Sequence, residues 1–215
     1  SRDEVGLLAQ SFNRMAEQLA DSLQRLKDHV LATLQSLAAA LEAKDVHTRG
    51  HSERVTFYAT RMAKQMGFST DETEIISQFS RLHDIGKIGI KEEILNKPAK
   101  LTPEEFNDIK RHPDLGYKIL APLKPPQLAL DIVRHHHERQ DGQGYPDRVA
   151  GERIPLAVAI VTVADAFDGM TGHRPYRPPM TFLEAVEELR RCTGTQFHPK
   201  AVEGIIGVLR KDGKL

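Results

Sequence analysis

The first 44 residues constrain the fold most, because they predict one long helix with a narrow apolar stripe. This segment contains no proline, and Gly6 is its only glycine. Apolar side chains recur in steps of four, three and four residues, an 11-residue repeat with about 3.67 residues per turn. The repeated positions are Leu8, Phe12, Met15, Leu19, Leu23, Leu26, Val30, Leu34, Leu37 and Leu41. The stripe therefore stays nearly parallel to the helix axis.

A stripe this narrow on so long a helix needs a partner surface. We favour a parallel homodimer in which the N-terminal helices of two copies pair as a coiled coil. The alternative is that the stripe packs on the chain's own globular domain.

After about residue 45 the pattern changes to short helices with clear starts and stops. Residues 69–72, 102–105 and 181–184 each fit a capping box, and Gly67 fits a helix stop. Residues 158–163 are rich in valine and isoleucine, but no other convincing strand exists to pair with them, so we place them on a buried helix. The sequence therefore predicts an all-α fold.

Charge and cysteine content exclude several classes of function. The 215 residues include 30 Lys+Arg and 30 Asp+Glu, so the chain lacks the basic field that DNA or RNA polymers require. A small phosphorylated ligand in a local pocket remains compatible with this balance. Cys192 is the only cysteine, which excludes an intrachain disulfide and an all-cysteine zinc site. No apolar run approaches the ~20 residues that span a bilayer, and no signal peptide is recognisable.

Clusters of histidine and aspartate carry the chemistry. The pair His83-Asp84 alone would be weak, because a histidine at a helix end often bonds to a neighbouring aspartate. Similar clusters recur along the chain, and together they offer five imidazoles and two carboxylates: His51, His83, Asp84, His112, His136, His137 and Asp165. That number exceeds what one zinc ion takes and suits two divalent metals that share a carboxylate. Ligands without sulfur favour iron or manganese, with zinc and nickel as alternatives.

Residues 44–210 resemble the HD-GYP phosphodiesterases, a branch of the HD superfamily. The resemblance rests on His83-Asp84 and above all on the block His136-His137-Glu138-Arg139-Gln140-Asp141-Gly142-Gln143-Gly144-Tyr145-Pro146. It implies an HD-type helical bundle that hydrolyses cyclic di-GMP to pGpG, GMP or both. It also implies the same seven residues as metal ligands, with Asp84 catalytic as well, and its register favours His136 and His137 over His135.

The resemblance further implies contacts with the substrate. Lys87, four residues after His83, is expected at the scissile phosphate as a catalytic and substrate-binding residue. Arg174 and Arg177 are expected to bind the ligand's phosphates, and Tyr145 to line the pocket. The alternatives are a solvated or helix-capping Lys87 and ordinary loop charges at the two arginines.

Five more residues are expected to support the site. Asp141 would orient a ligand histidine, and Asp168 would do the same or stabilise local structure. Gly142, Gly144 and Pro146 would shape the loop, because glycine permits positive φ and proline stiffens the chain.

His47 is an open position. It lies four residues before His51, so both share one face if the helix extends that far. Some HD-GYP relatives hold a third metal here through a glutamate. His47 could ligate such a metal, but we expect two metals per protomer rather than three.

The start of the chain resembles a second family. Asp3-Glu4-Val5-Gly6-Leu7-Leu8-Ala9, followed by Phe12, Asn13 and Met15, is similar to the end of a HAMP signal-relay domain. We therefore expect the HAMP end at residues 1–22, a helical coiled-coil linker at 23–44 and the phosphodiesterase domain at 45–215. The resemblance implies transmembrane helices upstream, so we expect the cytoplasmic portion of a bacterial inner-membrane receptor.

The sequence thus predicts a bimetallic cyclic di-GMP phosphodiesterase. Two alternatives stay open: a catalytically idle HD-GYP module that relays a signal or binds a partner, and an HD-type phosphohydrolase of another nucleotide. The intact ligand set argues against the first alternative, and the Gly144-Tyr145-Pro146 block argues against the second.

Overall fold

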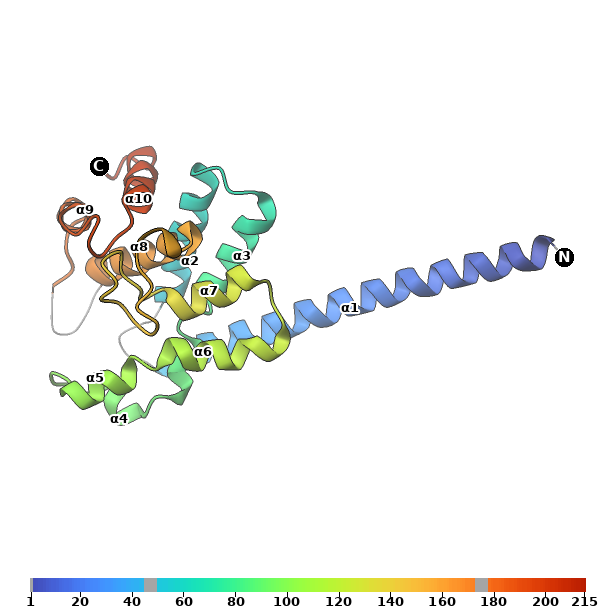
Figure 1. The fold of residues 1–215 in the computed structure, drawn as a ribbon, viewed down its shortest axis with the longest axis horizontal. Coiled ribbons are helices and arrows are strands. Elements are labelled where there is room, and N and C mark those ends of the chain that lie inside the picture. The colour runs from blue at the N-terminus through green and yellow to red at the C-terminus, as the bar shows by residue number, and fades with distance from the viewer. Residues whose placement is uncertain (1, 45–49, 173–177) are drawn as a thin grey trace. The chain divides into compact units, whose positions relative to one another are not determined.

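The structure, a computed structural model, describes residues 2–44, 50–172 and 178–215. Within these residues the fold is all-α, as predicted (Figure 1). The helices are α1 (Arg2–Lys44), α2 (His51–Gln65), α3 (Thr70–Ser80), η1 (Ile85–Gly89), α4 (Glu92–Leu95), α5 (Pro103–Ile109), α6 (His112–Leu120), η2 (Ala121–Leu123), α7 (Gln127–His135), η3 (Gly151–Arg153), α8 (Leu156–Thr171), α9 (Phe182–Arg191) and α10 (Pro199–Lys211). None of these described helices combines the length and the apolarity that crossing a membrane requires.

The chain divides into two compact units, residues 1–37 and 38–215. The first unit lies within α1 and confirms the long N-terminal helix. Its apolar stripe is exposed: Leu8 exposes 72% of its surface, Phe12 63% and Leu19 60%. A single helix cannot bury such a stripe by itself, so pairing with a second copy stays a prediction, as do the domain boundaries at residues 22 and 44.

Local sequence signals explain several helix boundaries of the second unit. The three predicted capping boxes are confirmed, because Ser69, Thr102 and Thr181 each exchange hydrogen bonds with the glutamate three residues on. After α2, Gly67 has a φ of 83°, and the Phe68 N–H donates to the carbonyl of Ala63 at 3.1 Å. This Schellman-type end confirms Gly67 as the predicted helix stop.

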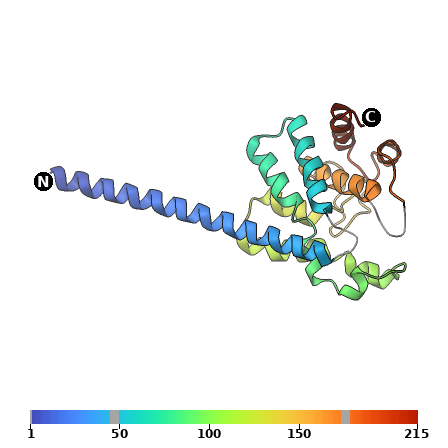
Figure 2. The same ribbon diagram turned by 180° about the vertical axis from the view of Figure 1, so that it is seen from behind.

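Helix α8 forms the centre of the second unit. It packs against α2, α7, α9 and α10 (Figures 1 and 2). Val158, Ile160, Val161 and Val163 are fully buried, which confirms that residues 158–163 form a buried helix rather than a strand. A helix that is apolar on every side has to be covered on every side. This packing holds the C-terminal half of α8 beside the first turn of α2.

A close contact between η1 and α6 brings two other parts of the chain together. A Cβ atom at Gly86 would collide with the carbonyl of His112 and with the backbone nitrogen of Gly116. Glycine is therefore required for the two segments to approach this closely. The contact places Asp84, just before η1, beside His112 at the start of α6.

Candidate metal centre

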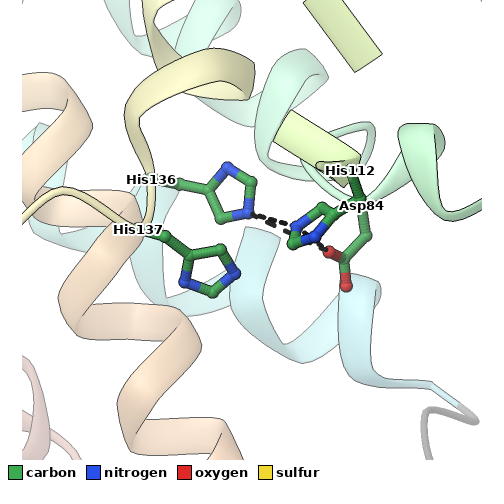
Figure 3. Close-up of side chains that lie close together, drawn as sticks. All are labelled: Asp84, His112, His136 and His137. Carbon is green, nitrogen blue, oxygen red and sulfur yellow. Dashed lines mark hydrogen bonds and ion pairs between the residues drawn. The ribbon is translucent and has the colours of Figure 1, made fainter. Parts of the chain in front are cut away.

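Seven side chains from α2, α6, α8, the end of α7 and the turn after α3 meet inside the second unit. In each of two groups, one potential ligand atom per residue lies within 4.8 Å of the others. The Asp84 group contains Asp84, His112, His136 and His137 (Figure 3). The His51 group contains His51, His83 and Asp165. The structure thus brings together all seven residues that the sequence indicated, whereas His135 pairs with Asp147 at 3.0 Å.

Three of the histidines are oriented by backbone carbonyls. Each uses Nδ1 to donate to the carbonyl three residues earlier: His83 to Ser80 at 2.6 Å, His112 to Ile109 at 2.8 Å and His136 to Val133 at 2.9 Å. A carbonyl only accepts, so Nδ1 carries the proton and Nε2 keeps its lone pair. The three Nε2 atoms therefore face the cluster as potential ligands.

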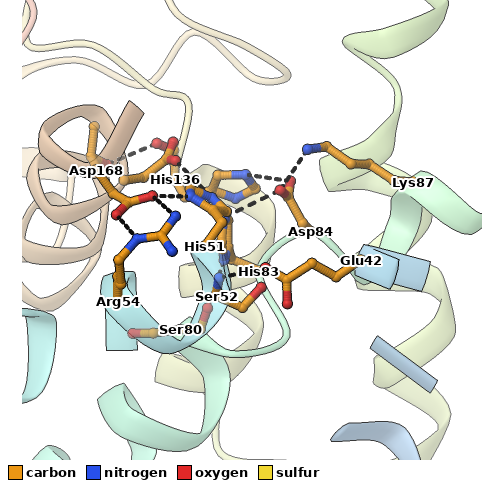
Figure 4. A network of polar contacts seen from close by, with 12 residues as sticks. Glu42, His51, Ser52, Arg54, Ser80, His83, Asp84, Lys87, His136 and Asp168 are labelled. Atoms are coloured by element: carbon orange, nitrogen blue, oxygen red, sulfur yellow. Dashed lines mark hydrogen bonds and ion pairs between the residues drawn. The ribbon is translucent and has the colours of Figure 1, made fainter. Parts of the chain in front are cut away.

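His51, the first residue of α2, is oriented by a carboxylate instead. Its Nδ1 lies 2.7 Å from Asp168 Oδ2, and its Nε2 lies 3.2 Å from Asp165 Oδ1. Arg54 binds the same Asp168 carboxylate through two hydrogen bonds of 2.5 and 3.1 Å (Figure 4). Asp168 therefore orients His51, one of the two roles expected for it. Arg54 was not among the predicted site residues, although the spacing of three residues from His51 to Arg54 and from Asp165 to Asp168 could have indicated matching helix faces.

Asp84 lies between the two groups. Its Oδ1 is 3.2 Å from His112 Nε2, and its Oδ2 is 3.5 Å from His83 Nε2. One carboxylate oxygen thus faces each group, as a shared ligand requires. Lys87 Nζ also lies 2.6 Å from Oδ2 (Figure 4). Burial alone would raise the pKa of Asp84, but Lys87 and the neighbouring histidines hold it well below its usual value, so the group is a carboxylate.

Unsatisfied lone pairs show that the cluster fits cations. His112 Nε2 and His136 Nε2 lie 3.2 Å apart, although both rings carry their proton on Nδ1. His83 Nε2 is buried and has no hydrogen-bond partner within the described residues. Facing acceptors repel each other, and a buried unsatisfied acceptor costs about 1–3 kcal/mol. A bound cation would remove both penalties, so this set of nitrogen and oxygen donors fits divalent metal ions.

Burial and charge also set the protonation states of the histidines. Burial lowers the pKa of His137 to about 3 and holds the pKa of His136 well below its usual range, so both imidazoles are neutral at pH 7. His51 differs, because Asp165 and Asp168 outweigh its burial and raise its pKa to about 10. The pocket between these two carboxylates therefore favours a positive charge, which either a proton or a metal ion can supply.

The loop after α7 forms one wall beside the cluster. The ring of Tyr145 stacks on that of His137, with centroids 4.9 Å apart and an interplanar angle of 30°. A Cβ atom at Gly144 would lie 2.5–2.6 Å from backbone atoms of residues 137–139, so close approach requires this glycine. Gly142 instead has a φ of 72°, as expected, and Pro146 follows a cis peptide bond.

Asp141 differs from expectation. The sequence suggested that it orients a ligand histidine, but its carboxylate binds Arg139 through hydrogen bonds of 3.0 and 2.7 Å. Its Oδ1 also accepts the N–H of Gln143 at 3.0 Å. The guanidinium two residues away offers a bidentate partner within the loop, so Asp141 stabilises the loop itself.

Three predicted site residues, His47, Arg174 and Arg177, lie outside the described residues. Helix α2 begins at His51, and Gly50 before it has a left-handed φ of 70°. The helical register that was assumed to join His47 to His51 therefore does not continue through Gly50. Phosphate binding by the two arginines stays a prediction.

Two protein families match this chain. Residues 35–201 match the HD domain family, and residues 1–21 match the HAMP domain family. Both resemblances that the sequence motifs indicated are thereby confirmed.

Known relatives agree with these matches. The chain is 39% identical over 194 residues to the cyclic di-GMP phosphodiesterase response regulator RpfG of Xanthomonas campestris. That alignment covers 89% of this chain and 51% of the relative. It is 41% identical over 182 residues to a cyclic di-GMP phosphodiesterase of Thermotoga maritima, and that alignment covers 84% of this chain and 50% of the relative. The chain thus spans about half the length of these two relatives.

A solved structure shares the fold. The crystal structure of a cyclic GMP-AMP specific phosphodiesterase from Vibrio cholerae superposes with a TM-score of 0.66 at 20% identity, covering 86% of this chain and 49% of the other. Because the family match runs through all seven clustered side chains, from His51 to Asp165, the chain belongs to the HD domain family, as its HD-GYP motifs predicted.

Proposed function

We propose that this chain hydrolyses a phosphodiester bond of cyclic di-GMP and releases pGpG, GMP or both. The observation that carries the proposal is the pair of ligand groups joined by Asp84, with Lys87 at their edge. Two adjacent cation sites suit in-line cleavage of a phosphodiester. The choice of substrate is supported by two relatives named as cyclic di-GMP phosphodiesterases.

The residues of the Asp84 group and the His51 group would together hold two divalent cations. Cations bound there would supply Lewis acidity toward the phosphate and would lower the pKa of a bound water toward neutrality. We propose iron or manganese, with zinc and nickel as alternatives, because the ligands include no sulfur. Two metals rather than three are proposed because the nearby carboxylate of Asp168 already binds His51 and Arg54.

Lys87 and Tyr145 are the described residues proposed to act on the substrate. Lys87 Nζ is held 2.6 Å from Asp84 Oδ2, which fixes an ammonium where negative charge on the scissile phosphate would grow. Lys87 or water would protonate the departing 3′ oxygen. Tyr145 shapes the pocket wall, and burial holds the pKa of its hydroxyl well above the usual range, so that it stays a hydrogen-bond donor. Arg174 and Arg177 are proposed as further phosphate contacts on the strength of their motif.

We also propose that the domain is the output of a membrane-linked receptor. The HAMP match covers the first 21 residues, and α1 continues without a break from that match to residue 44. Pairing of two α1 stripes would join two copies in parallel. The chain would then be the cytoplasmic portion of a bacterial inner-membrane protein.

A substrate comparison tests the proposed function. Anaerobically purified protein loaded with iron or manganese is offered cyclic di-GMP, 3′3′-cGAMP, dGTP and ppGpp at equal concentrations. We expect cyclic di-GMP to be cleaved fastest. Preferred hydrolysis of dGTP or ppGpp would identify a different phosphohydrolase, and preferred hydrolysis of 3′3′-cGAMP would change the substrate within the cyclic dinucleotides.

A double variant, His83→Ala together with Asp84→Ala, removes two of the proposed metal ligands. We expect it to lose turnover while its far-UV circular dichroism stays close to that of the unchanged chain. Activity retained in this variant would refute the proposed site.

A further inference from the structure

Two separate pockets border the metal-ligand cluster. Lys87 lines a pocket together with His51 and Asp84. The second pocket includes His137 and Asp165 from the cluster and extends past Tyr145 to residues 106–110. The proposed metal ligands thus border two different spaces, with Lys87 lining the first and Tyr145 lining the second.

Lys110 is the distinctive charge of this second pocket. Its Nζ lies 4.6 Å from the centroid of the Phe106 ring and 5.7 Å from that of the Tyr145 ring. The two rings hold the ammonium by cation–π attraction, which leaves its charge in place. Among the described residues, no carboxylate forms an ion pair with Lys110.

Arg139, the other described cation that lines this pocket, differs in this respect. It binds Asp141 through two hydrogen bonds, so its charge is neutralised within the loop. Lys110 is therefore the described side chain that gives this pocket a positive charge available to an incoming anion.

The position of Lys110 relative to the cluster is fixed by stacking. His137, a proposed metal ligand, stacks on Tyr145, and Tyr145 in turn lies under the Lys110 ammonium. One aromatic ring thus separates the metal ligand from the cation. Phe106 exposes 45% of its surface, so the ammonium lies beside a ring that solvent reaches.

We propose that Lys110 binds the phosphate of the cyclic dinucleotide that is not being cleaved. The inference rests on the proposed function, because a cyclic dinucleotide carries two phosphodiester groups and only one reacts in the first step. A cation one ring away from the cluster suits the second phosphate. The exposed face of Phe106 offers a stacking surface for the adjoining base.

The test compares Lys110→Met and Lys110→Arg in the metal-loaded chain. Two substrates are used: cyclic di-GMP and bis(p-nitrophenyl) phosphate, a diester with a single phosphate. Lys110→Met should raise KM for cyclic di-GMP about tenfold with kcat nearly unchanged, because it removes one charged hydrogen bond to the bound phosphate. Lys110→Arg should retain most of the affinity, and neither variant should change turnover of the aryl diester.

Lys118→Met is the matched control, because Lys118 is an exposed lysine of α6 that pairs with Asp114. It should leave KM for both substrates unchanged. An unchanged KM for cyclic di-GMP in Lys110→Met would overturn the assignment of Lys110, as would an equal loss on both substrates. If the unchanged chain cleaved the aryl diester but no cyclic dinucleotide, the proposed function itself would fail, and the assignment of Lys110 with it.

Discussion

His51 Nδ1 donates to Asp168 Oδ2 at 2.7 Å, and Arg54 donates to both oxygens of the same carboxylate. This hydrogen bond keeps Nε2 of His51 directed toward Asp165. We expect Asp168→Asn to weaken metal binding at the His51 group by about 10–100-fold, because an amide holds the imidazole less firmly and can favour the other tautomer. Competition with a chromogenic chelator measures this affinity.

Asp212→Asn is the control for that substitution. Asp212 forms a comparable bidentate pair with Arg61, and neither residue belongs to the metal cluster. Metal affinity should stay unchanged in Asp212→Asn. Equal affinities in the Asp168 and Asp212 variants would show that Asp168 does not support the site.

Glu42 links the last turn of α1 to the first turn of α2. Its Oε1 accepts the backbone N–H of Ser52 at 3.0 Å, while Gly50 at the N-cap position offers no side chain (Figure 4). Glu42→Ala should lower the free energy of unfolding by about 1 kcal/mol, the usual value of a helix cap. Because the proposed metal ligand His51 directly precedes Ser52, metal affinity should fall as well.

Glu42→Gln keeps an acceptor oxygen and should restore most of both properties. Glu17→Ala, on the exposed surface of α1, should change neither. Urea unfolding with and without metal provides the measurement. A Glu42→Ala chain as stable as the unchanged chain would show that this contact is not a cap.

Asp147 fastens the loop after Tyr145 to α7. Its carboxylate binds Arg134 at 2.7 and 3.0 Å and His135 at 3.0 Å. The hydrogen bonds from Arg134 lower the pKa of Asp147 from 3.8 to about 2. Partial burial acts to raise this pKa, and His135 acts to lower it further. A lowered carboxyl pKa stabilises the fold fully above the unfolded value and loses that effect as pH falls through the folded value.

Asp147→Asn should therefore be less stable than the unchanged chain at about pH 5, and the difference should shrink between about pH 4 and pH 2. Urea unfolding of chelator-treated protein at several pH values measures it. A difference that stays constant down to about pH 2 would contradict an ionised Asp147 in the fold.

The exposed stripe of α1 predicts a dimer. Leu19 and Leu23 expose 60% and 52% of their surface in the single chain. Leu19→Asp together with Leu23→Asp should shift the chain from dimer to monomer in sedimentation velocity, because buried charges destabilise a coiled-coil seam. Gln18→Asp together with Gln24→Asp, which changes polar positions beside the stripe, should not. A monomeric unchanged chain would contradict the predicted pairing.

Much of the fold could be predicted because its signals are local. A capping box such as that of Thr102 and Glu105 depends on residues three apart, and a stop such as Gly67 depends on one residue. The contact of η1 with α6 could not be predicted, because the need for Gly86 arises from the backbone of His112 and Gly116, which only the folded chain brings near.

The residues of the candidate site likewise include some that the sequence indicated and some that only the folded chain reveals. Metal ligands are restricted to a few residue types, so the recurring histidine and aspartate clusters, together with the HD-GYP resemblance, indicated residues such as His83 and Asp84. Arg54 was missed because its partner, Asp168, lies 114 residues away. Asp141 was given the wrong partner because the choice between a histidine and Arg139 depends on the path of the loop, which composition does not reveal.

The proposed function is hydrolysis of cyclic di-GMP at a site with two bound metal ions. Elemental analysis of anaerobically purified protein, coupled to a cyclic di-GMP turnover assay on the same sample, tests it most directly. We expect about two iron or manganese ions per protomer and formation of pGpG. Fewer than two metals per protomer and no turnover after anaerobic loading with iron or manganese would contradict it and favour a catalytically idle signalling module.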